Sequence, residues 1–221
     1  MTSRIAKIVW AFTIGATLSE GAALVYAFSL HANWLSAAFH YAIHPAGTPA
    51  AWCLAVLIAS VYVAYGVRRS PVIRHYAFRP DYWGPFAAVR LVAIVMAIVT
   101  GYFEELIFRK VFMDYAMTAG YGVALQILFS AITFGAAHAI WGLFEGKLRA
   151  AMSAMIATGV LGGLLAIDYI VGERSLAPCA AAHIAISLIM EPWLIITAAS
   201  GSWGMGSVPP SVVAARTDQN A

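Results

Sequence analysis

Six long apolar stretches follow one another along this chain, and they restrict its possible folds more than any other feature. They cover residues 8–30, 50–67, 84–112, 122–144, 150–171 and 176–199. A helix that crosses the hydrocarbon core of a bilayer needs about 20 mostly apolar residues. The stretches therefore predict an all-α, polytopic membrane protein with about six transmembrane helices in one domain, residues 1–200. The tail, residues 201–221, is rich in small and polar residues and is expected to be disordered.

The composition excludes a water-soluble globular protein. Hydrophobic residues make up 62% of the chain and charged residues 10%, and the mean hydropathy is +0.81, which leaves too little polar surface to cover a soluble core. The formal net charge is +3, but the basic residues form no face or stripe, so no nucleic-acid partner is expected. Cys53 and Cys179 lie in apolar stretches without metal-ligand spacing and are expected to be buried free thiols.

The loops between the stretches differ in basic residues. The side that holds both termini carries nine: Arg4, Lys7, Arg68, Arg69, Arg74, Arg79, Lys147, Arg149 and Arg216. The other side carries three: Arg109, Lys110 and Arg174. The excess of basic residues on the cytoplasmic side of membrane proteins predicts that both termini are cytoplasmic. Residues 68–84 form a basic, aromatic juxtamembrane segment that either lies along the membrane surface or is a solvated loop that sets orientation.

Several ionisable residues lie inside the predicted helices. A charge near the centre of a bilayer costs on the order of 3 kcal/mol, so each one needs a partner, an aqueous cavity or a function. Those inside or at the edges of the apolar stretches are Glu20, Arg90, Glu104, Glu105, Arg109, His138, Asp168, His183 and Glu191. We therefore expect several of them to share a polar interior.

The densest group lies in the segment GYFEELIFRK, residues 101–110. Glu105 and Arg109 are four residues apart, which in an α-helix places them on one face in the favourable order of acid before base. Glu104 is turned by about 100° from Glu105. The geometry predicts a structural ion pair between Glu105 and Arg109, and it leaves Glu104 free to face another group. The alternative is a plain ion-pair cluster at a membrane edge, in which Glu104 is a costly unpaired acid.

Histidines in two later stretches are candidate partners for Glu104. His138 follows Phe134 by four residues in FGAAH, where small residues allow another helix or an extended peptide to come close. His183 lies near the start of the last stretch, and Ser187 follows one turn later on the same face, where its hydroxyl can donate a hydrogen bond. For each histidine, the alternative is an interhelical hydrogen bond without a chemical role.

Glu104, His138 and His183 suit two chemistries. In the first, Glu104 and His138 take a proton from a water molecule that attacks a carbonyl carbon, and His183 stabilises the oxyanion. In the second, the three side chains bind a zinc ion that acidifies the water. The spacing lacks the paired histidines of H-E-x-x-H. We therefore favour a site without a cofactor, and the zinc site stays open as the alternative.

Together, these residues resemble the CPBP family of intramembrane endopeptidases, which includes the Ras-converting CAAX prenyl proteases and the bacteriocin-processing and abortive-infection proteins. Three motifs carry the resemblance: E-E-x-x-x-R, F-x-x-x-H, and a histidine followed four residues later by Asn or Asp. In order, they correspond to Glu104, Glu105, Arg109, Phe134, His138, His183 and Ser187. Ser187 departs from the third motif, and its hydroxyl is shorter than an amide and donates one hydrogen bond. The family-like core covers about residues 84–199.

The resemblance implies an intramembrane endopeptidase that hydrolyses a peptide bond of a membrane-associated protein or peptide. Glu104 and His138 would activate water and His183 would lie near the oxyanion, while Glu105, Arg109, Phe134 and Ser187 would shape the site. Glu104 and His183 lie in the outer halves of their predicted helices, which favours a site that opens away from the cytoplasm.

The expected partners are the lipid bilayer and a membrane-associated peptide or protein substrate, and the sequence indicates no oligomeric state. The expected location is a bacterial cytoplasmic membrane. Because Ser187 departs from the motif, the alternative function is a non-catalytic immunity or scaffold protein on the same fold. A proton or ion transporter is a third hypothesis, since intramembrane carboxylates and histidines commonly carry protons. No inverted repeat supports it.

Overall fold

The computed structural model describes residues 2–30, 46–69, 73, 87–143 and 148–199, and these residues contain helices and no strand. The helices in chain order are α1 (Thr2–Ser29), α3 (Pro49–Arg69), α5 (Ala87–Glu105), the π-helix η1 (Leu106–Met113), α6 (Asp114–Thr118), α7 (Val123–His138), α8 (Ile140–Leu143), α9 (Leu148–Val171) and α10 (Leu176–Ala199). The α5, η1 and α6 segments follow one another without a break.

Six helical segments in the described part of the chain are long and apolar enough to cross a membrane, which confirms the predicted architecture. They are Lys7–Ser29, Pro49–Arg69, Leu91–Thr118, Val123–Leu143, Leu148–Val171 and Leu176–Ile195. The largest difference from the sequence prediction is in the third segment, which continues past residue 112 to Thr118. Glu104 therefore lies at the middle of its span and not in the outer half, which removes one of the two reasons for an outward-opening site.

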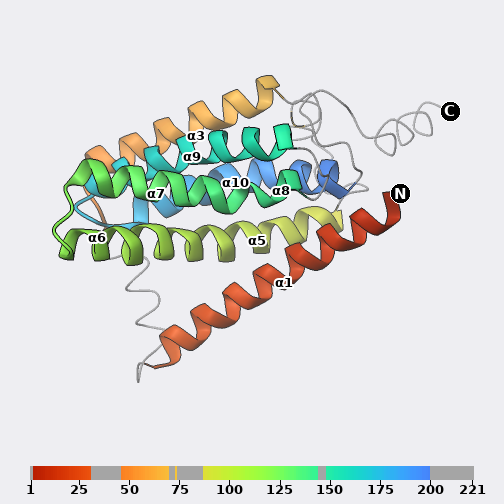
Figure 1. Ribbon diagram of the computed structural model, residues 1–221, viewed down its shortest axis with the longest axis horizontal. Coiled ribbons are helices and arrows are strands. Elements are labelled where there is room, and N and C mark those ends of the chain that lie inside the picture. The colour runs from red at the N-terminus through yellow and green to blue at the C-terminus, as the bar shows by residue number, and fades with distance from the viewer. Residues whose placement is uncertain (1, 31–45, 70–72, 74–86, 144–147, 200–221) are drawn as a thin grey trace.

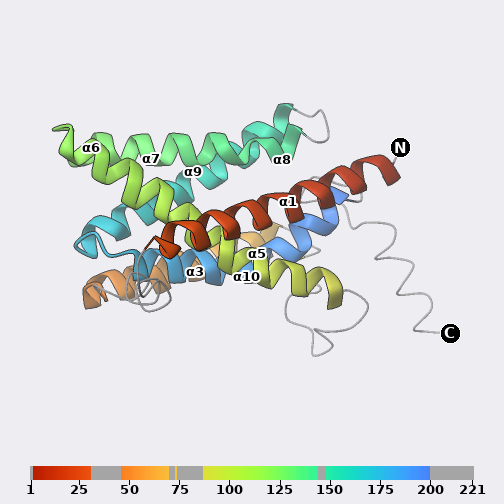
Figure 2. The ribbon, with the colours of Figure 1, turned by 90° about the horizontal axis from the view of Figure 1, so that it is seen from below.

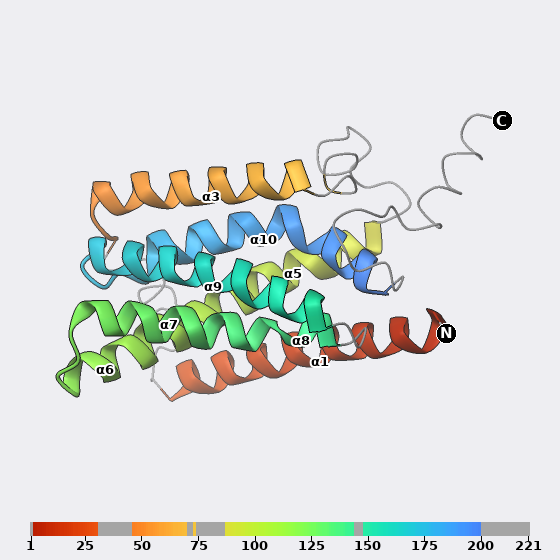
Figure 3. The ribbon, with the colours of Figure 1, turned by 45° about the horizontal axis from the view of Figure 1, so that its top comes forward.

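Successive spans run in alternate directions, so α1 begins and α10 ends at the same end of the bundle (Figure 1). The central helix is α10, which packs against α1, α3, α5 and α9 and is buried over most of its span. Figure 3 shows α7 beside α9 and α3 beside α10. Helix α1 crosses α5 obliquely at the edge of the bundle (Figure 2).

The outward faces of the helices carry apolar side chains, and the interior holds polar ones. Leu18, Val56, Leu91, Leu128 and Ile156 are each more than half exposed. Fully or nearly fully buried polar side chains include Glu105, Arg109, Gln126, Ser130, Asp168, His183 and Ser187. This distribution suits a protein whose surroundings are lipid, because polar groups in a bilayer must find their partners within the protein.

Helices α7 and α9 touch backbone to backbone because glycines line their contact. A Cβ atom at Gly135 would lie 2.4 Å from the carbonyl oxygen of Met155 and 3.0 Å from the Cα of Gly159. Close approach of this kind is typical of small residues at helix interfaces in membranes. The small residues next to His138 thus bring a neighbouring helix close, as the sequence predicted.

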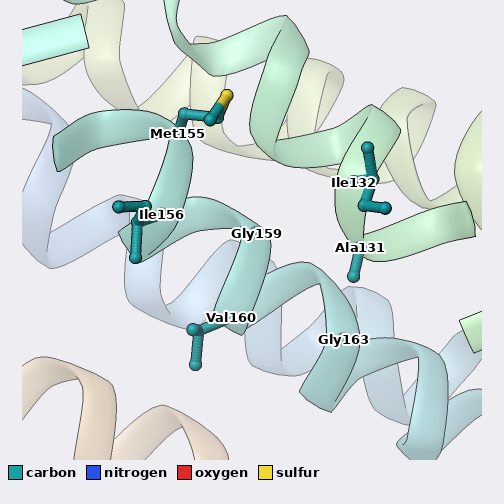
Figure 4. A pocket seen from close by; sticks show the side chains of 7 residues that line it. All are labelled: Ala131, Ile132, Met155, Ile156, Gly159, Val160 and Gly163. Atoms are coloured by element: carbon teal, nitrogen blue, oxygen red, sulfur yellow. The ribbon is translucent and has the colours of Figure 1, made fainter. Parts of the chain in front are cut away.

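A shallow apolar groove borders this contact on the outer surface of α7 and α9 (Figure 4). Its volume is about 400 Å³, and it is lined by Ala131, Ile132, Met155, Ile156, Gly159, Val160 and Gly163. None of these side chains carries a polar group that can form a strong hydrogen bond, so the groove suits the apolar surroundings of a bilayer.

The turn between α9 and α10 fixes where α10 begins, and thereby the position of His183. Arg174 Nη1 donates to Asp114 Oδ1 at 2.8 Å, and Arg174 Nη2 donates to Gln126 Oε1. The Tyr169 hydroxyl donates to the same Asp114 oxygen at 3.0 Å. Arg174 has a φ of +64°, which is uncommon for a residue with a side chain. These bonds join the turn to α6 and α7.

The sequence also led to predictions about the juxtamembrane segment, the tail and the two cysteines. Of the basic juxtamembrane segment, only Arg68 and Arg69 at the end of α3 and the buried Ile73 are described. The rest of that segment and the tail, 201–221, lie outside the described residues. Cys179 is a buried free thiol as predicted, but the predicted burial of Cys53 is wrong, because this face of α3 points away from the bundle.

We predict that Gly135→Ala destabilises the protein by about 1–3 kcal/mol, the usual cost of overpacking a close contact. The added methyl group would meet backbone atoms of α9, which cannot rotate away. Thermal unfolding of the purified protein in detergent measures the effect. Gly15→Ala in α1 is the matched control, since a methyl group there would have no neighbouring atom within 4 Å. Equal unfolding temperatures for the two variants would contradict the close α7 and α9 contact.

Candidate active site

Three helices bring the predicted site residues together. Glu104 lies at the end of α5, His138 is the last residue of α7, and His183 lies two turns into α10. Glu104 Oε2 is 3.7 Å from His138 Nε2 and 3.8 Å from His183 Nε2. The acid and the two imidazoles therefore converge on one point within the membrane-spanning part of the protein, whatever their chemical roles.

The neighbouring Glu105 is the centre of a buried polar cluster. Its Oε2 lies 2.9 Å from Arg109 Nε, which confirms the ion pair expected from the spacing. Its Oε1 lies 2.9 Å from His183 Nδ1. The Cys179 thiol is buried and donates to the carbonyl oxygen of Leu176 at 3.2 Å. Glu105 and Arg109 are both fully buried. The contact of Glu105 with His183 was not expected.

The hydrogen bonds of the two histidines fix which ring nitrogen faces Glu104. His138 Nδ1 lies 2.9 Å from the carbonyl oxygen of Phe134. A carbonyl only accepts, so Nδ1 carries a proton and the neutral ring directs the lone pair of Nε2 towards Glu104. His183 Nδ1 donates in the same way to the Glu105 carboxylate. Both rings are thereby held with Nε2 near the same carboxylate oxygen.

The Phe134 ring packs against both histidines. Its centroid is 4.5 Å from that of His138, with the rings tilted by 30°, and 5.5 Å from that of His183 in an edge-to-face arrangement. The Arg109 guanidinium lies over the Phe134 ring, 5.0 Å from its centroid, and the Phe108 ring meets it at 5.1 Å. Phe134 is fully buried. Its predicted contribution to the shape of the site agrees with this packing.

A π-helix follows the two acids, where the sequence predicted a regular α-helix. It covers Leu106–Met113 and includes Arg109. Ser130 of α7, which the sequence analysis did not single out, is fully buried beside it. The Ser130 hydroxyl donates to the carbonyl oxygen of Phe108 and accepts from Arg109 Nη1, both at 3.3 Å. Widened turns of this kind are frequent at functional sites.

Glu104 has an oxygen that the protein itself does not satisfy. Its side chain is 17% exposed, and Oε2 is buried without a hydrogen-bond partner in the described part of the protein. The separations of 3.7 and 3.8 Å from the two Nε2 atoms are too long for direct hydrogen bonds, but water can bridge polar groups at such separations. The arrangement is suited to hold a small polar group between an acid and two imidazoles.

Ser187 lies one turn after His183 and is buried, as the spacing predicted. Glu191 lies one further turn along α10, beside Ser187. A hydroxyl carries one proton, so Ser187 can donate to one acceptor at a time.

The same three side chains are slightly farther apart than the ligands of a bound zinc ion. Ligands of a tetrahedral zinc ion lie about 2.0–2.2 Å from the metal, so two ligand atoms are about 3.3–3.6 Å apart. Glu104 Oε2 is 3.7 Å from His138 Nε2 and 3.8 Å from His183 Nε2. Among the residues with described positions, no group of three or more His, Cys, Asp or Glu side chains is arranged to hold a metal ion. We therefore assign no zinc-dependent step to these residues.

Comparison with known proteins gave a match to one family model. The family model described as type II CAAX prenyl endopeptidase Rce1-like matches residues 86–189. This range contains all three motifs, from Glu104 to Ser187, so the resemblance to the CPBP and CAAX prenyl protease family is confirmed. The comparisons with curated proteins and with solved structures found no match.

We predict that Glu105→Gln destabilises the protein by about 3–5 kcal/mol, because it leaves the buried Arg109 charge uncompensated. Thermal unfolding in detergent measures this. Lys110→Met is the matched control, since Lys110 forms a partly exposed ion pair with Asp114 at the same spacing of four residues and such pairs contribute about 0–1 kcal/mol. If the two variants unfold at the same temperature, Glu105 does not stabilise this cluster.

Proposed function

From the match to the type II CAAX prenyl endopeptidase family, we propose that this protein is an intramembrane endopeptidase that hydrolyses a peptide bond of a membrane-associated protein or peptide. The observation that carries the proposal is the position of Glu104 Oε2 between the Nε2 atoms of His138 and His183. A carboxylate and two imidazoles at this spacing can hold a water molecule and move its proton.

In the proposed mechanism, a water molecule lies between Glu104 and His138. As its oxygen attacks the carbonyl carbon of the scissile bond, Glu104 takes its proton, and His138 orients the water through Nε2. The carbonyl oxygen becomes an oxyanion. When the carbon–nitrogen bond breaks, the proton held by Glu104 passes to the leaving amine.

His183 is proposed to stabilise the oxyanion by donating from Nε2. This requires protons on both ring nitrogens, since Nδ1 already donates to Glu105. The buried carboxylate of Glu105 favours that positively charged ring, and Arg109 keeps the same carboxylate ionised. We assign the oxyanion contact to His183, whose Nε2 lies 3.8 Å from Glu104 Oε2, and give Ser187 a role in shaping α10.

We place the protein in a bacterial cytoplasmic membrane with both termini in the cytoplasm. The excess of Lys and Arg on the side of the termini supports this orientation. The start of α1 and the end of α10, which lie at the same end of the bundle (Figure 1), are consistent with it. The substrate class in this setting is a leader peptide or a membrane-anchored tail, which reaches the site from within or beside the bilayer.

We predict that Glu104→Gln and His138→Ala each reduce peptide cleavage by about 10²- to 10⁴-fold, the usual contribution of a general base. The measurement is a comparison of peptide ends in the membrane proteins of cells that contain each variant. Glu20→Gln is the matched control. It makes the same change in a span, but the Glu20 carboxylate accepts from Thr100 and lies outside the proposed mechanism.

Two outcomes of this experiment are informative. Loss of cleavage with Glu104→Gln and His138→Ala, but not with Glu20→Gln, supports hydrolysis at the proposed site. If both site variants are inserted and folded and retain full biological activity, the endopeptidase proposal fails. A non-catalytic immunity or scaffold function on the same fold then becomes the better explanation.

We predict that the active protein works without zinc. After purification, its zinc content should be far below one ion per chain, and a chelator should leave the cleavage rate unchanged. Elemental analysis and a cleavage assay with and without chelator measure this. One zinc ion per chain, with activity lost on chelation and restored by added zinc, would instead assign Glu104, His138 and His183 as metal ligands.

A further inference from the structure

The Phe134 ring contacts three polar side chains of the candidate site. The His138 ring lies against it at 4.5 Å between centroids, the His183 ring meets it at 5.5 Å, and the Arg109 guanidinium lies over it at 5.0 Å. The backbone carbonyl of Phe134 also accepts the hydrogen bond that orients His138. A displacement of Phe134 therefore changes the orientation of both imidazoles.

On the side of α9, Phe134 lies directly against the backbone of Gly162. A Cβ atom at Gly162 would lie 2.9 Å from the Cβ of Phe134, 3.0 Å from its Cδ1 and 3.1 Å from its Cγ. Non-bonded carbon atoms normally stay about 3.5–4.0 Å apart. The nearest of these atoms is the Cβ of Phe134, which rotation of the ring does not move. A side chain at Gly162 must therefore shift Phe134 as a whole or push α9 away.

The next residue in the chain gives a contrast. A Cβ atom at Gly163 would meet only the Cβ of Ala131, at 3.5 Å, which is an ordinary contact. Both glycines lie inside α9, so a change to alanine removes the same backbone freedom at each position and adds the same methyl group. The two positions differ chiefly in whether that methyl group meets Phe134.

We propose that Gly162 is a positioning residue that acts through Phe134 to orient His138 and His183. Because Gly162 has no side chain, Phe134 can pack close to α9. This position of Phe134 places the Nε2 atoms of His138 and His183 near Glu104. The importance of this alignment for cleavage rests on the proposed function, whereas the alignment of the rings is a property of the fold.

The effect on the reaction is expected in the chemical step. Gly162 itself is fully covered by Phe134 on this face, so it does not touch a substrate. Small misplacements of groups that act on the reacting atoms cost up to about 10²-fold in rate. Gly162→Ala should therefore lower kcat by about tenfold to a hundredfold and leave KM nearly unchanged. Gly163→Ala should change neither.

A second readout follows the histidines directly. In protein labelled with ¹⁵N at histidine, the ring signals of His138 report the hydrogen bond from its Nδ1 to Phe134. We expect Gly162→Ala to shift these signals and Gly163→Ala to leave them in place. This measurement is made on the full-length protein in detergent and requires no substrate. It therefore distinguishes a failure of this proposal from a failure of the proposed function.

Shifted His138 signals with a reduced kcat in Gly162→Ala alone support the proposal. Unchanged His138 signals in a folded Gly162→Ala protein would overturn it, whether or not cleavage is affected. If Glu104→Gln retains cleavage but the His138 signals shift in Gly162→Ala, the positioning role stands and the proposed function does not.

A double variant tests the contact even if Gly162→Ala strongly destabilises the protein. Phe134→Ala removes Cγ and Cδ1, two of the three atoms that the new methyl group meets, and leaves only Cβ. Gly162→Ala should then cost less unfolding free energy in the Phe134→Ala background than in the wild type, because contacting residues have non-additive effects. Equal costs in both backgrounds would contradict the proposed contact.

Discussion

The buried carboxylate of Glu105 is the interaction on which the site depends. A charged group at mid-membrane depth is costly, and here two groups from two elements stabilise it: Arg109 in η1 forms an ion pair with it, and His183 in α10 donates a hydrogen bond to it. These contacts fix the rotation of α10 relative to α5. Glu104, the preceding residue in the helix, must then point elsewhere, and it points to the gap between the two imidazoles.

The site also depends on the close packing of α7 against α9. Helix α9 contributes none of the proposed reacting groups, yet its glycines determine how closely α7 can approach. Gly159 allows backbone contact with Gly135, and Gly162 receives Phe134. Because membrane helices have no hydrophobic driving force towards one another, close packing of this kind is a main source of their association. The hydrogen bond to Glu105 therefore holds His183, and the packing of α9 holds Phe134 against both histidines.

Local spacing accounts for the parts of this arrangement that the sequence predicted. Six apolar stretches define six spans, and the separation of four residues between Glu105 and Arg109 defines an ion pair on one helical face. The motifs also indicated that Glu104, His138 and His183 would meet. The end of the third span was missed because Asp114 lies inside it. Its charge interrupts the apolar pattern, but Arg174 and Lys110 neutralise it in the folded protein.

Other features depend on contacts between distant segments and have no local signal. The π-helix at Leu106–Met113 is bonded to Ser130, a residue of a different helix, and nothing in its own apolar sequence distinguishes it from an α-helix. The bond between Glu105 and His183 joins residues 78 positions apart.

If the proposed cleavage takes place beside Glu104, the location of Glu104 halfway along its span sets a condition on the substrate. A helix that enters the bilayer satisfies its own amide groups, and its scissile carbonyl is shielded by the surrounding turns. To present that carbonyl to Glu104, the segment must unwind locally, which exposes amides where lipid offers no partner. Sequences that form weak helices, with Gly or Pro near the cleaved bond, lose the least by unwinding. Local helix stability would then discriminate among polypeptides independently of any side-chain pocket.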